Sequence, residues 1–565
     1  MTSDSEITVD QQVDSAPQAL KGGALAPLRE PVFRRIWGAS FLSNFGQLIL
    51  GVGVAWEMTR LTSSPAMVAL VQTALMLPLM LVALPAGAIA DTFDRRKIAM
   101  LGLVIAAFFG SVLSVLAFFE LTFPWLLLAF CSLIGTGVAI YNPAWQSSIG
   151  EQVKPADLPA AIALGTISYN VARSFGPAIG GLIVLTAGAQ AAFAVNALSY
   201  LPLILAFFLW QRGSIPSRLP PEHIARAIVS GVRYAFHSHP IRTVLIRAFI
   251  FGLAGATATA LAPLIAKDLL DGDAATFGIL LGASGLGAVA GALMINFIRG
   301  HLGIEKAVSM LAVLGGLALV GVGLSHSLAL TCAGLFLVGG CTMVTIALFN
   351  ISVQLTAPRW VMARALSLFS SALTGGIAVG AWFWGSIANN WSIEAAIIAS
   401  GMSMLLLATV GLLLRLPELD QAGAESVAIA NEPEVALAVT LRSGPVVIEV
   451  DYRIGQESAR AYYDAMLEVR RVRLRNGAFN WSITRDIGEP TLWTERYHFP
   501  TWGDYLRMRD RFTQADLESQ HEADAFMIDG YAKRVRRGLE RPFGSVRWKV
   551  GAPDTHQDGV VYVGP

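Results

Sequence analysis

Residues 66–97 read AMVALVQTALMLPLMLVALPAGAIADTFDRRK, an almost entirely apolar run that ends in a short turn with two acids and three bases. A helix of about 20 apolar residues is long enough to cross a hydrocarbon core of about 30 Å. The stretch therefore predicts a membrane-spanning helix over residues 66–89, followed by a charged turn at the membrane surface.

The same alternation of apolar run and charged gap continues from residue 31 to residue 415. It predicts twelve spans, at residues 34–58, 66–89, 98–118, 124–149, 159–185, 190–210, 243–265, 275–298, 305–324, 328–355, 361–388 and 392–414. The expected fold class of this part is all-α, a polytopic membrane protein with 12 transmembrane helices.

Positive charge lies almost wholly in alternate gaps. Of the 22 Lys and Arg between Met1 and Arg415, nineteen fall on one side if the N-terminus is cytoplasmic, and Arg60 and Lys267 fall on the other. Arg173 is interpreted as the only basic residue inside a span. By the positive-inside rule, both termini are expected in the cytoplasm.

The composition divides the chain in two. A hydrophobic content of 54% over 565 residues excludes an ordinary soluble protein. Residues 31–415 carry 20 basic and 12 acidic side chains, whereas the 150 residues 416–565 carry 19 and 23, which indicates a water-solvated domain. The net charge of +1 gives no indication of a nucleic-acid partner, and Cys131, Cys332 and Cys341 are spread over spans and suggest no disulfide framework. The first thirty residues lack the pattern of a removable signal peptide and are interpreted as a polar tail.

The turn after the second span has two interpretations. In the first, its three basic residues simply hold the turn on the cytoplasmic side of the membrane. Its spacing Gly87-x3-Asp91-x3-Arg95-Arg96-Lys97 also resembles the signature loop of the major facilitator superfamily, in the branch of the enterobactin exporter and related secretion transporters. The resemblance implies a latch, formed by Gly87, Asp91, Arg95 and Arg96, that closes the cytoplasmic side in the outward-open state. Thr92 and Asp94 depart from the usual loop.

The fifth span contains Gly176-Pro177-Ala178-Ile179-Gly180-Gly181. Small residues let helices approach closely in lipid, which is the structural interpretation of Gly176, Gly180 and Gly181. The order also resembles the fifth-helix motif of exporters and antiporters of the same superfamily, which implies export.

Polar residues inside the spans are candidates for the substrate pathway. Several come in pairs three or four residues apart, which places both members on one helix face. The candidates are Asn44, Gln47, Tyr141, Asn142, Gln146, Asn170, Arg173, Asn350 and Gln354. Interhelical hydrogen bonding is the alternative role for such residues, and a structural partnership is the alternative for Arg173.

The energy source is open. No acidic residue lies clearly at mid-membrane, since Glu57 and Glu120 are near span ends, so a proton as coupling ion is implied only by the resemblance. The sequence has no nucleotide-binding loop that ends in Gly-Lys-Ser/Thr, and no residue pattern calls for a cofactor or a metal. The resemblance implies a small-molecule substrate, no enzyme activity and a place in the cytoplasmic (inner) membrane of a bacterium.

Weak similarity between residues 155–183 and 358–386 favours two six-helix halves. The expected domains are a polar tail (1–30), the N-terminal half (31–210), a cytoplasmic inter-half loop (211–240), the C-terminal half (241–415), a linker (416–440), a cytoplasmic α+β domain (441–550) and a final tail (551–565). Within the loop, residues 223–236 form an amphipathic stretch.

The soluble domain shows strand and helix patterns in the order β-α-β-β-α-β, which is ferredoxin-like. Apolar residues alternate over 446–454, around 479–483 and over 493–499; a helix is expected over 457–475, helical residues from Trp502 to about Arg537, and a last strand over 545–550. The domain resembles the antibiotic-biosynthesis-monooxygenase type, which implies a homodimer. His498 suggests a ligand pocket, although a lone histidine on a strand is more often structural.

Two functions follow as hypotheses. The first is secondary export of a small amphipathic molecule, such as a siderophore, drug or other natural product, with import as its rival. The second is a membrane-anchored enzyme or ligand sensor that acts through the C-terminal domain.

Overall fold

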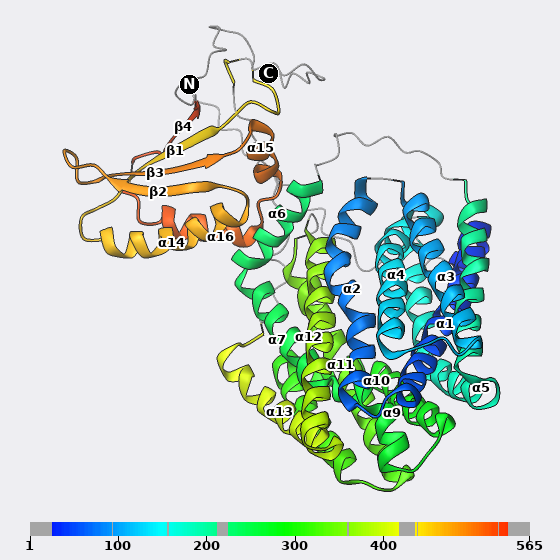
Figure 1. Ribbon diagram of the computed structural model, residues 1–565. Coiled ribbons are helices and arrows are strands. Elements are labelled where there is room, and N and C mark those ends of the chain that lie inside the picture. The colour runs from blue at the N-terminus through cyan, green and yellow to red at the C-terminus, as the bar shows by residue number, and fades with distance from the viewer. Residues whose placement is uncertain are drawn as a thin grey trace.

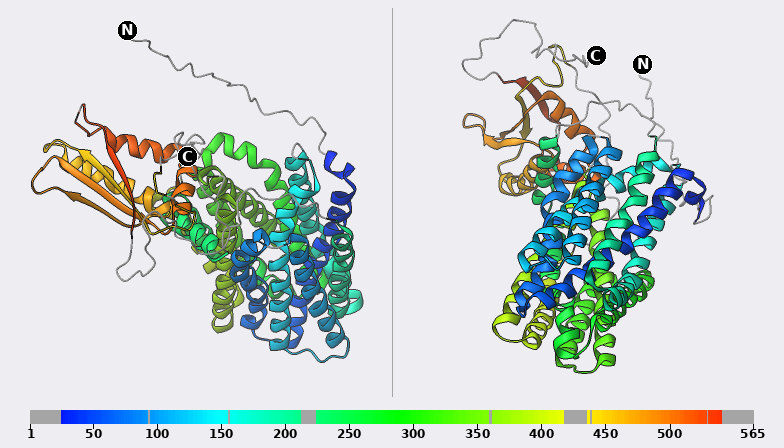
Figure 2. Two further views of the ribbon diagram at one scale, coloured as in Figure 1. Left: turned by 90° about the horizontal axis from the view of Figure 1, so that it is seen from above. Right: turned by 45° about the vertical axis from the view of Figure 1, so that its right-hand side comes forward.

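The computed structural model has a large helical part and a smaller sheet-containing domain at one end of it (Figure 1). It describes residues 25–92, 94–154, 157–211, 224–358, 361–416, 435–437, 439–528 and 530–540. In Figure 2 the sheet-containing domain lies to one side of the helical part, next to α6 (Ile224–His237).

Eleven helical segments among the described residues are long and apolar enough to cross a membrane. They are α1 (Pro31–Leu61), α2 (Pro65–Thr92), α3 (Arg95–Phe118), α4 (Pro124–Gln152), α5 (Leu158–Leu209), a broken helix from α7 to η3 (His239–Leu269), two segments of α10 (Ala274–Leu324), α11 (Leu328–Thr356), α12 (Met362–Asn390) and α13 (Ile393–Leu413). A short helix, η1 (Ala26–Arg29), precedes them.

Two of these helices fold back on themselves. At about 1.5 Å per residue, the 52 residues of α5 and the 51 residues of α10 would each extend more than twice the thickness of a membrane core. Each of the two helices reverses direction at a glycine in the left-handed region, Gly188 (φ 77°) in α5 and Gly303 (φ 69°) in α10. Residues with a Cβ rarely adopt this backbone conformation. With both helices counted as two legs, the chain crosses twelve times, as the charge pattern predicts.

The seventh span is broken near its end. It consists of α7 (His239–Gly255), α8 (Thr257–Ala260), α9 (Ala262–Leu264) and the π-helical turn η3 (Ile265–Leu269). Pro263 has no N–H to donate, so a regular helix cannot continue through it unchanged. The sequence predicts one continuous helix here.

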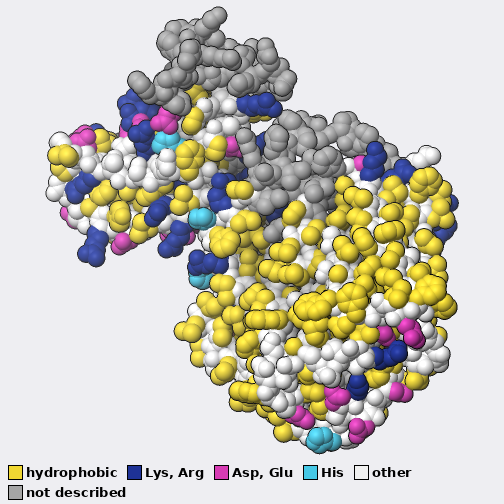
Figure 3. All heavy atoms as spheres, viewed as in Figure 1, with side chains coloured by type: hydrophobic (Ala, Val, Ile, Leu, Met, Phe, Trp, Pro, Cys, Tyr) yellow, Lys and Arg dark blue, Asp and Glu magenta, His cyan; other side chains and the backbone are white. Residues whose placement is uncertain are grey.

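The outer surface of the helical part is apolar. On α3, Leu101, Val104, Phe108 and Val115 lie along one face, and each is more than half exposed. Figure 3 shows hydrophobic side chains covering most of the visible face of the helices, with charged side chains gathered toward its upper and lower ends. A water-soluble protein rarely exposes a patch of this size, so this surface is the one that contacts lipid, and the protein is a multi-pass membrane protein.

One sequence interpretation is wrong. Arg173 is not the only basic residue inside a span, because Arg247 lies in α7 and is fully buried. Its Nη1 donates to both carboxylate oxygens of Glu305 in α10, at 2.8 and 2.6 Å, and to the carbonyl of Leu414. Glu305 also accepts from the backbone N–H of Leu416. The ion pair thus ties α7 and α10 to the chain leaving α13.

We expect Glu305→Ala to destabilise the helical part, because Arg247 would remain buried without its counter-ion. Removing one partner of a buried ion pair lowers the free energy of unfolding by about 3–5 kcal/mol. Because Glu305 is 32% exposed, we expect a loss of stability at or below the lower end of this range. The measurement is the apparent melting temperature in detergent. The double change Arg247→Leu with Glu305→Leu leaves no unpaired charge and should lose less; a single variant as stable as the parent would show that the pair contributes little.

The C-terminal domain is a four-stranded antiparallel sheet with helices on one face. Its elements are β1 (Val446–Arg453), α14 (Ala459–Arg475), β2 (Phe479–Arg485), β3 (Leu492–Phe499), α15 (Trp502–Asp510), α16 (Gln514–Asp524) and β4 (Arg534–Leu539). The strand order is β2-β3-β1-β4. Alternate residues of β1, Val446, Ile448, Val450 and Tyr452, are buried in the domain's core, so the predicted period of two is confirmed.

The prediction of helical residues up to Arg537 is wrong. The last helix among the described residues ends at Asp524, and Arg534–Leu539 form β4 at the edge of the sheet, paired with β1. Five of its six residues are exposed, so the strand has no alternating apolar pattern to reveal it. The predicted strand at 545–550 lies outside the described residues.

Candidate functional site

The two halves of the bundle, α1–α5 and α7–α13, meet along two helix pairs. We call the end that carries residues 59–64, 267–273 and 389–393 the distal end, and the end that carries residues 94–97, 151–154 and 237–242 the proximal end. The pairs are α2 with α12 and α5 with α10. The C-terminal domain lies at the proximal end (Figure 1).

The α2–α12 pair is joined from the distal end inward. Ser64 Oγ donates to Asn389 Oδ1 at 2.8 Å, and Thr73 Oγ1 donates to the carbonyl of Ala378 at 2.8 Å. Between them, Gly385 lies so close to α2 that an added Cβ would be 2.4 Å from the Cβ of Ala69. Small residues and hydrogen bonds therefore hold this seam.

A further distal contact joins α1 to the second half. Lys267 Nζ donates to the carbonyl of Thr59 at 2.6 Å, and the rings of Trp56 and Phe277 stack with centroids 6.4 Å apart. Together with the α2–α12 contacts, these interactions close the bundle at its distal end.

The Gly176–Gly181 motif lies between α1 and α10. A Cβ on Gly180 would lie 3.2 Å from the Cα of Ile49 in α1, and one on Gly181 would lie 2.6 Å from the carbonyl oxygen of Ala274 in α10. From the other side, a Cβ on Gly278 would lie 2.8 Å from the carbonyl oxygen of Pro177. The motif thus makes the backbone contact between the halves possible, in agreement with the packing interpretation.

We expect Gly181→Ala to force α5 and α10 apart and to impair both stability and transport, because inserting a methyl group into a packed interface costs about 1–3 kcal/mol. Gly165→Ala is the matched control on the same helix, since a Cβ there meets nothing within 4 Å. The measurements are melting temperature and substrate flux for both variants. Equal behaviour of the two would contradict the packing role of the motif.

The predicted latch is described in part. The surroundings of Gly87 and the side chain of Asp91 are not among the described features, although α2 runs to Thr92. Asp94 caps α3 and accepts from the backbone N–H of Arg96 at 3.0 Å.

The two arginines of the latch contact their own half of the bundle. Arg95 Nη1 donates to Glu151 Oε1 and to the carbonyl of Ser147 in α4, at 2.9 and 2.8 Å. Arg96 Nη2 donates to the carbonyl of Phe208 in α5. Breakable contacts of this kind suit a gate, and the gating role stays a prediction.

The polar pathway candidates fall into different environments. Asn44 Nδ2 donates to Ser168 Oγ at 3.0 Å and so joins α1 to α5. Gln354 Nε2 donates to Asn350 Oδ1 within α11. Two of the candidates are exposed, Gln146 and Gln354, and six are half-buried, namely Asn44, Gln47, Asn142, Asn170, Arg173 and Asn350.

Arg173 and Tyr141 differ most. Arg173 makes no hydrogen bond or ion pair with any residue that the structure describes, and it lies in α5 beside the seam with α10, where its carbonyl would be 2.7 Å from a Cβ on Gly285. Tyr141 is 3% exposed and packs edge-on against Phe207. Tyr141 is therefore enclosed by neighbouring helices, and ligand binding by the half-buried Arg173 stays a prediction.

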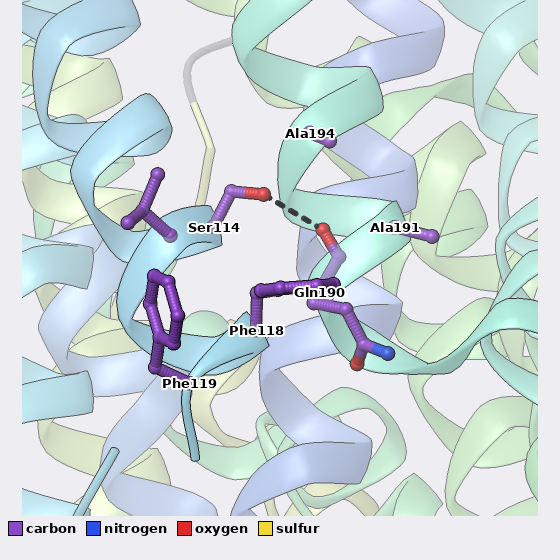
Figure 4. Close-up of a pocket in the computed structure, with 7 residues that line it drawn as sticks. Ser114, Phe118, Phe119, Gln190, Ala191 and Ala194 are labelled. Atoms are coloured by element: carbon purple, nitrogen blue, oxygen red, sulfur yellow. Dashed lines mark hydrogen bonds between the residues drawn. The ribbon is translucent and has the colours of Figure 1, made fainter. Parts of the chain in front are cut away.

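A surface pocket of about 330 Å³ lies away from these residues, between α3 and the second leg of α5 (Figure 4). It is lined by Ser114, Val115, Phe118, Phe119, Gln190, Ala191 and Ala194. Both phenylalanines are more than 60% exposed on the apolar outer surface. The pocket is thus a feature of the lipid-facing side and not of the interface between the halves.

In the C-terminal domain, His498 is mostly buried. Its Nε2 lies 3.4 Å from Glu540 Oε2, and its ring lies against Phe479 with centroids 5.5 Å apart. The described residues of the whole chain include no cluster of three or more His, Cys, Asp or Glu that could hold a metal ion.

Sequence reasoning missed two features. Arg247 lies within the predicted span 243–265, and Glu305 begins the predicted span 305–324, so two opposite charges at corresponding membrane depths were the available signal. No sequence pattern indicates the contact between α6 and α14, because it joins residues far apart in the chain.

Two helical halves that meet along paired helices are the arrangement typical of secondary transporters. The chain belongs to the family described as transmembrane secretion effector, which matches residues 22–543 and is of the major facilitator type. Members of this family are transporters and not enzymes. The match includes the helical part and most of the C-terminal domain.

Curated relatives are distant. The chain is 27% identical over 408 residues to the enterobactin exporter EntS of Escherichia coli, which covers 69% of this chain and 92% of that protein. It is 23% identical over 292 residues to the staphyloferrin A transporter of Staphylococcus aureus, which covers 51% of this chain and 72% of that protein.

Solved structures share the fold at low identity. A bacterial homologue of the iron transporter ferroportin in an inward-facing state matches with a TM-score of 0.56 and 13% identity, covering 68% of this chain and 98% of that chain. The nucleoside transporter NupG matches with a TM-score of 0.53 and 13% identity, covering 68% of this chain and 100% of that chain. These likenesses show the fold alone.

Proposed function

We propose that this protein exports a small amphipathic molecule across the cytoplasmic membrane of a bacterium by alternating access. The observation that carries the proposal is the position of the exporter-type motif Gly176–Gly181, wedged against α1 on one side and α10 on the other. The names of the two relatives, an enterobactin exporter and a staphyloferrin A transporter, support a siderophore-like natural product as substrate.

The orientation follows from charge. Arg34, Arg35 and the Arg95–Lys97 cluster lie at the proximal end, whereas Arg60 and Lys267 lie at the distal end. By the positive-inside rule the proximal end, both termini and the C-terminal domain face the cytoplasm. A bundle closed at its distal end is then in an inward-facing arrangement, from which an exporter loads its substrate.

The proposed cycle uses the latch and the seams in turn. Substrate enters between the halves from the cytoplasm and meets polar groups of α1, α4, α5 and α11, with Arg173 binding an anionic group. The Asp91, Arg95 and Arg96 latch then closes the proximal end while the distal contacts at Ser64 and Lys267 open. A proton moving inward is the proposed coupling ion.

Accumulation profiling tests this function. A deletion strain should retain more of the substrate than the same strain complemented with the wild-type gene, across a panel of siderophores, macrolides and other amphipathic compounds, and a protonophore should abolish the difference. Asp91→Ala, expressed at parental level, should behave as the deletion. Higher accumulation in the complemented strain would identify an importer, and unchanged flux in Asp91→Ala would remove the latch role.

For the C-terminal domain we propose a ferredoxin-like fold of the antibiotic-biosynthesis-monooxygenase type, which favours a homodimer or a ligand sensor. The β-α-β-β-α-β chain order and the strand order β2-β3-β1-β4 support the fold. The sheet face away from the helices carries Glu449, Arg496 and Arg536 in ion pairs, so a dimer that pairs these faces has to desolvate charges.

Removing residues 417–565 separates the transporter from the sensor hypothesis. We expect the truncated protein to remain monodisperse in detergent and to export substrate at an altered rate, because the described pathway candidates all lie before residue 416. Flux and size-exclusion profiles are the measurements. Complete loss of transport in a folded, membrane-inserted protein would instead favour a function centred on the C-terminal domain.

A further inference from the structure

Helix α6 lies between the C-terminal domain and the transport bundle. It contacts α14 on one side and α2, α7 and α12 on the other. It is not among the candidate spans, and Figures 1 and 2 both show it beside the proximal end of the bundle, next to the sheet domain. α2 and α12 are the helices of one seam between the halves, so α6 lies where a movement of that seam has to be accommodated.

The contact with the C-terminal domain is made by an aromatic ring and a cation. The guanidinium carbon of Arg475, at the end of α14, lies 5.5 Å from the ring centroid of Tyr234. Tyr234 is 3% exposed, and a cation is attracted more strongly to a desolvated ring than to one in water. Next to it, Gly477 has φ 111°, and a Cβ there would lie 2.8 Å from Arg233 Nη2, so the chain end of α14 is fitted closely against α6.

Arg475 is fixed within its own domain. It forms an ion pair with Asp516, which also accepts from Asn476 Nδ2 at 3.3 Å and from the backbone N–H of Thr513 at 3.0 Å as part of the capping box of α16. Burial raises the pKa of Tyr234 to about 12, although the positive charge of Arg475 lowers it. The ring is therefore neutral at physiological pH, and the contact does not change with pH in that range.

On its other side, α6 rests on α12. A Cβ on Gly231 would lie 3.0 Å from both Cβ and Cδ of Arg364, in the first turn of α12. At the opposite end of the same helix, Asn389 accepts the distal hydrogen bond from Ser64. The single helix α12 thus connects the α6 contact with the distal closure.

We propose that the C-terminal domain docks on α6 through Arg475 and Tyr234 and thereby stabilises the arrangement in which the distal end is closed. This inference rests on the proposed alternating access. Contacts present in one state and lost in the other shift the equilibrium by their free energy. Tyr234 and Arg475 are positioning residues, which act on the transport cycle through α6 and α12, and the C-terminal domain is a conformational brake on distal opening.

The test measures distal closure directly in the full-length protein. In a background with Cys131, Cys332 and Cys341 replaced by alanine, Ser64→Cys and Asn389→Cys are introduced and cross-linked with a short bifunctional thiol reagent. Tyr234→Ala should lower the initial cross-linking rate about threefold or more, because it depopulates the closed arrangement. Tyr234→Phe keeps the ring under Arg475 and should restore the parental rate.

Two further variants make the result specific. Phe236→Ala removes an exposed aromatic ring two residues along α6 and should cross-link as the parent does. Arg475→Lys keeps a charge for Asp516 but loses the planar guanidinium, and should lower the rate in the same direction even where Tyr234→Ala does not yield folded protein. Melting temperature reports the fold of each variant.

An unchanged cross-linking rate in Tyr234→Ala and Arg475→Lys would overturn the inference, as would Tyr234→Phe behaving like Tyr234→Ala. The readout needs no substrate, so it is independent of the proposed function. Altered cross-linking together with no export in cells would contradict export and leave the coupling intact. Normal export with unaltered cross-linking would support export and contradict the coupling.

Discussion

Close backbone approach between the two halves is the constraint on which the rest of this structure depends. Lipid tails are as apolar as leucine, so helices in a membrane are not driven together by the hydrophobic effect and have to gain from packing and hydrogen bonds. In the contact between α5 and α10, a Cβ added to Gly181, Gly278 or Gly285 would lie within about 3 Å of the backbone of the facing helix. Such a seam has few interlocking side chains, and two surfaces of this kind can slide or rock on one another with small changes in contact.

The charged groups are arranged around this interface between the halves. Arg247 and Glu305 lie within one half and fasten α7 and α10 to the chain after α13, so that half behaves as a unit. Arg95 with Glu151 does the same for α3 and α4 in the other half. Between the halves, by contrast, the described polar contacts are single hydrogen bonds such as those of Ser64 and Lys267. Strong interactions within each half and weak ones between the halves are what alternating access requires.

Much of the fold could be predicted from the sequence, because the membrane leaves few choices. Apolar length and the distribution of Lys and Arg define the crossings, and the period of two in Val446–Tyr452 defines β1. The failures have physical causes. Pro263 interrupts the seventh span, which the apolar pattern predicts as one helix, and β4 is an exposed edge strand rich in arginine that has no hydrophobic signature.

The site was less predictable than the fold. The packing role of Gly176–Gly181 follows from residue size, but its partners Ala274 and Gly278 are about a hundred residues away and no local pattern points to them. The same holds for Tyr234 and Arg475, which are separated by the whole second half, the linker, β1 and nearly all of α14. Contacts between segments that are distant in the sequence depend on how the helices and domains pack together. No periodic pattern in the sequence indicates that packing.

The family match through residue 543 makes the C-terminal domain part of the transporter's own architecture, and its interior explains how it can act on the bundle. Glu495 is fully buried and accepts from Arg473, Trp481 and Tyr452 at about 3 Å, while Arg473 also reaches Gln520. Burial raises the pKa of Tyr452, and the neighbouring Glu495 adds to this, so its hydroxyl stays a donor. A satisfied polar network of this kind specifies one packing of helices against sheet and makes the domain stiff. Stiffness matters because Arg475 lies only two residues beyond Arg473: a change at α6 is resisted by the whole domain and not absorbed by a single side chain.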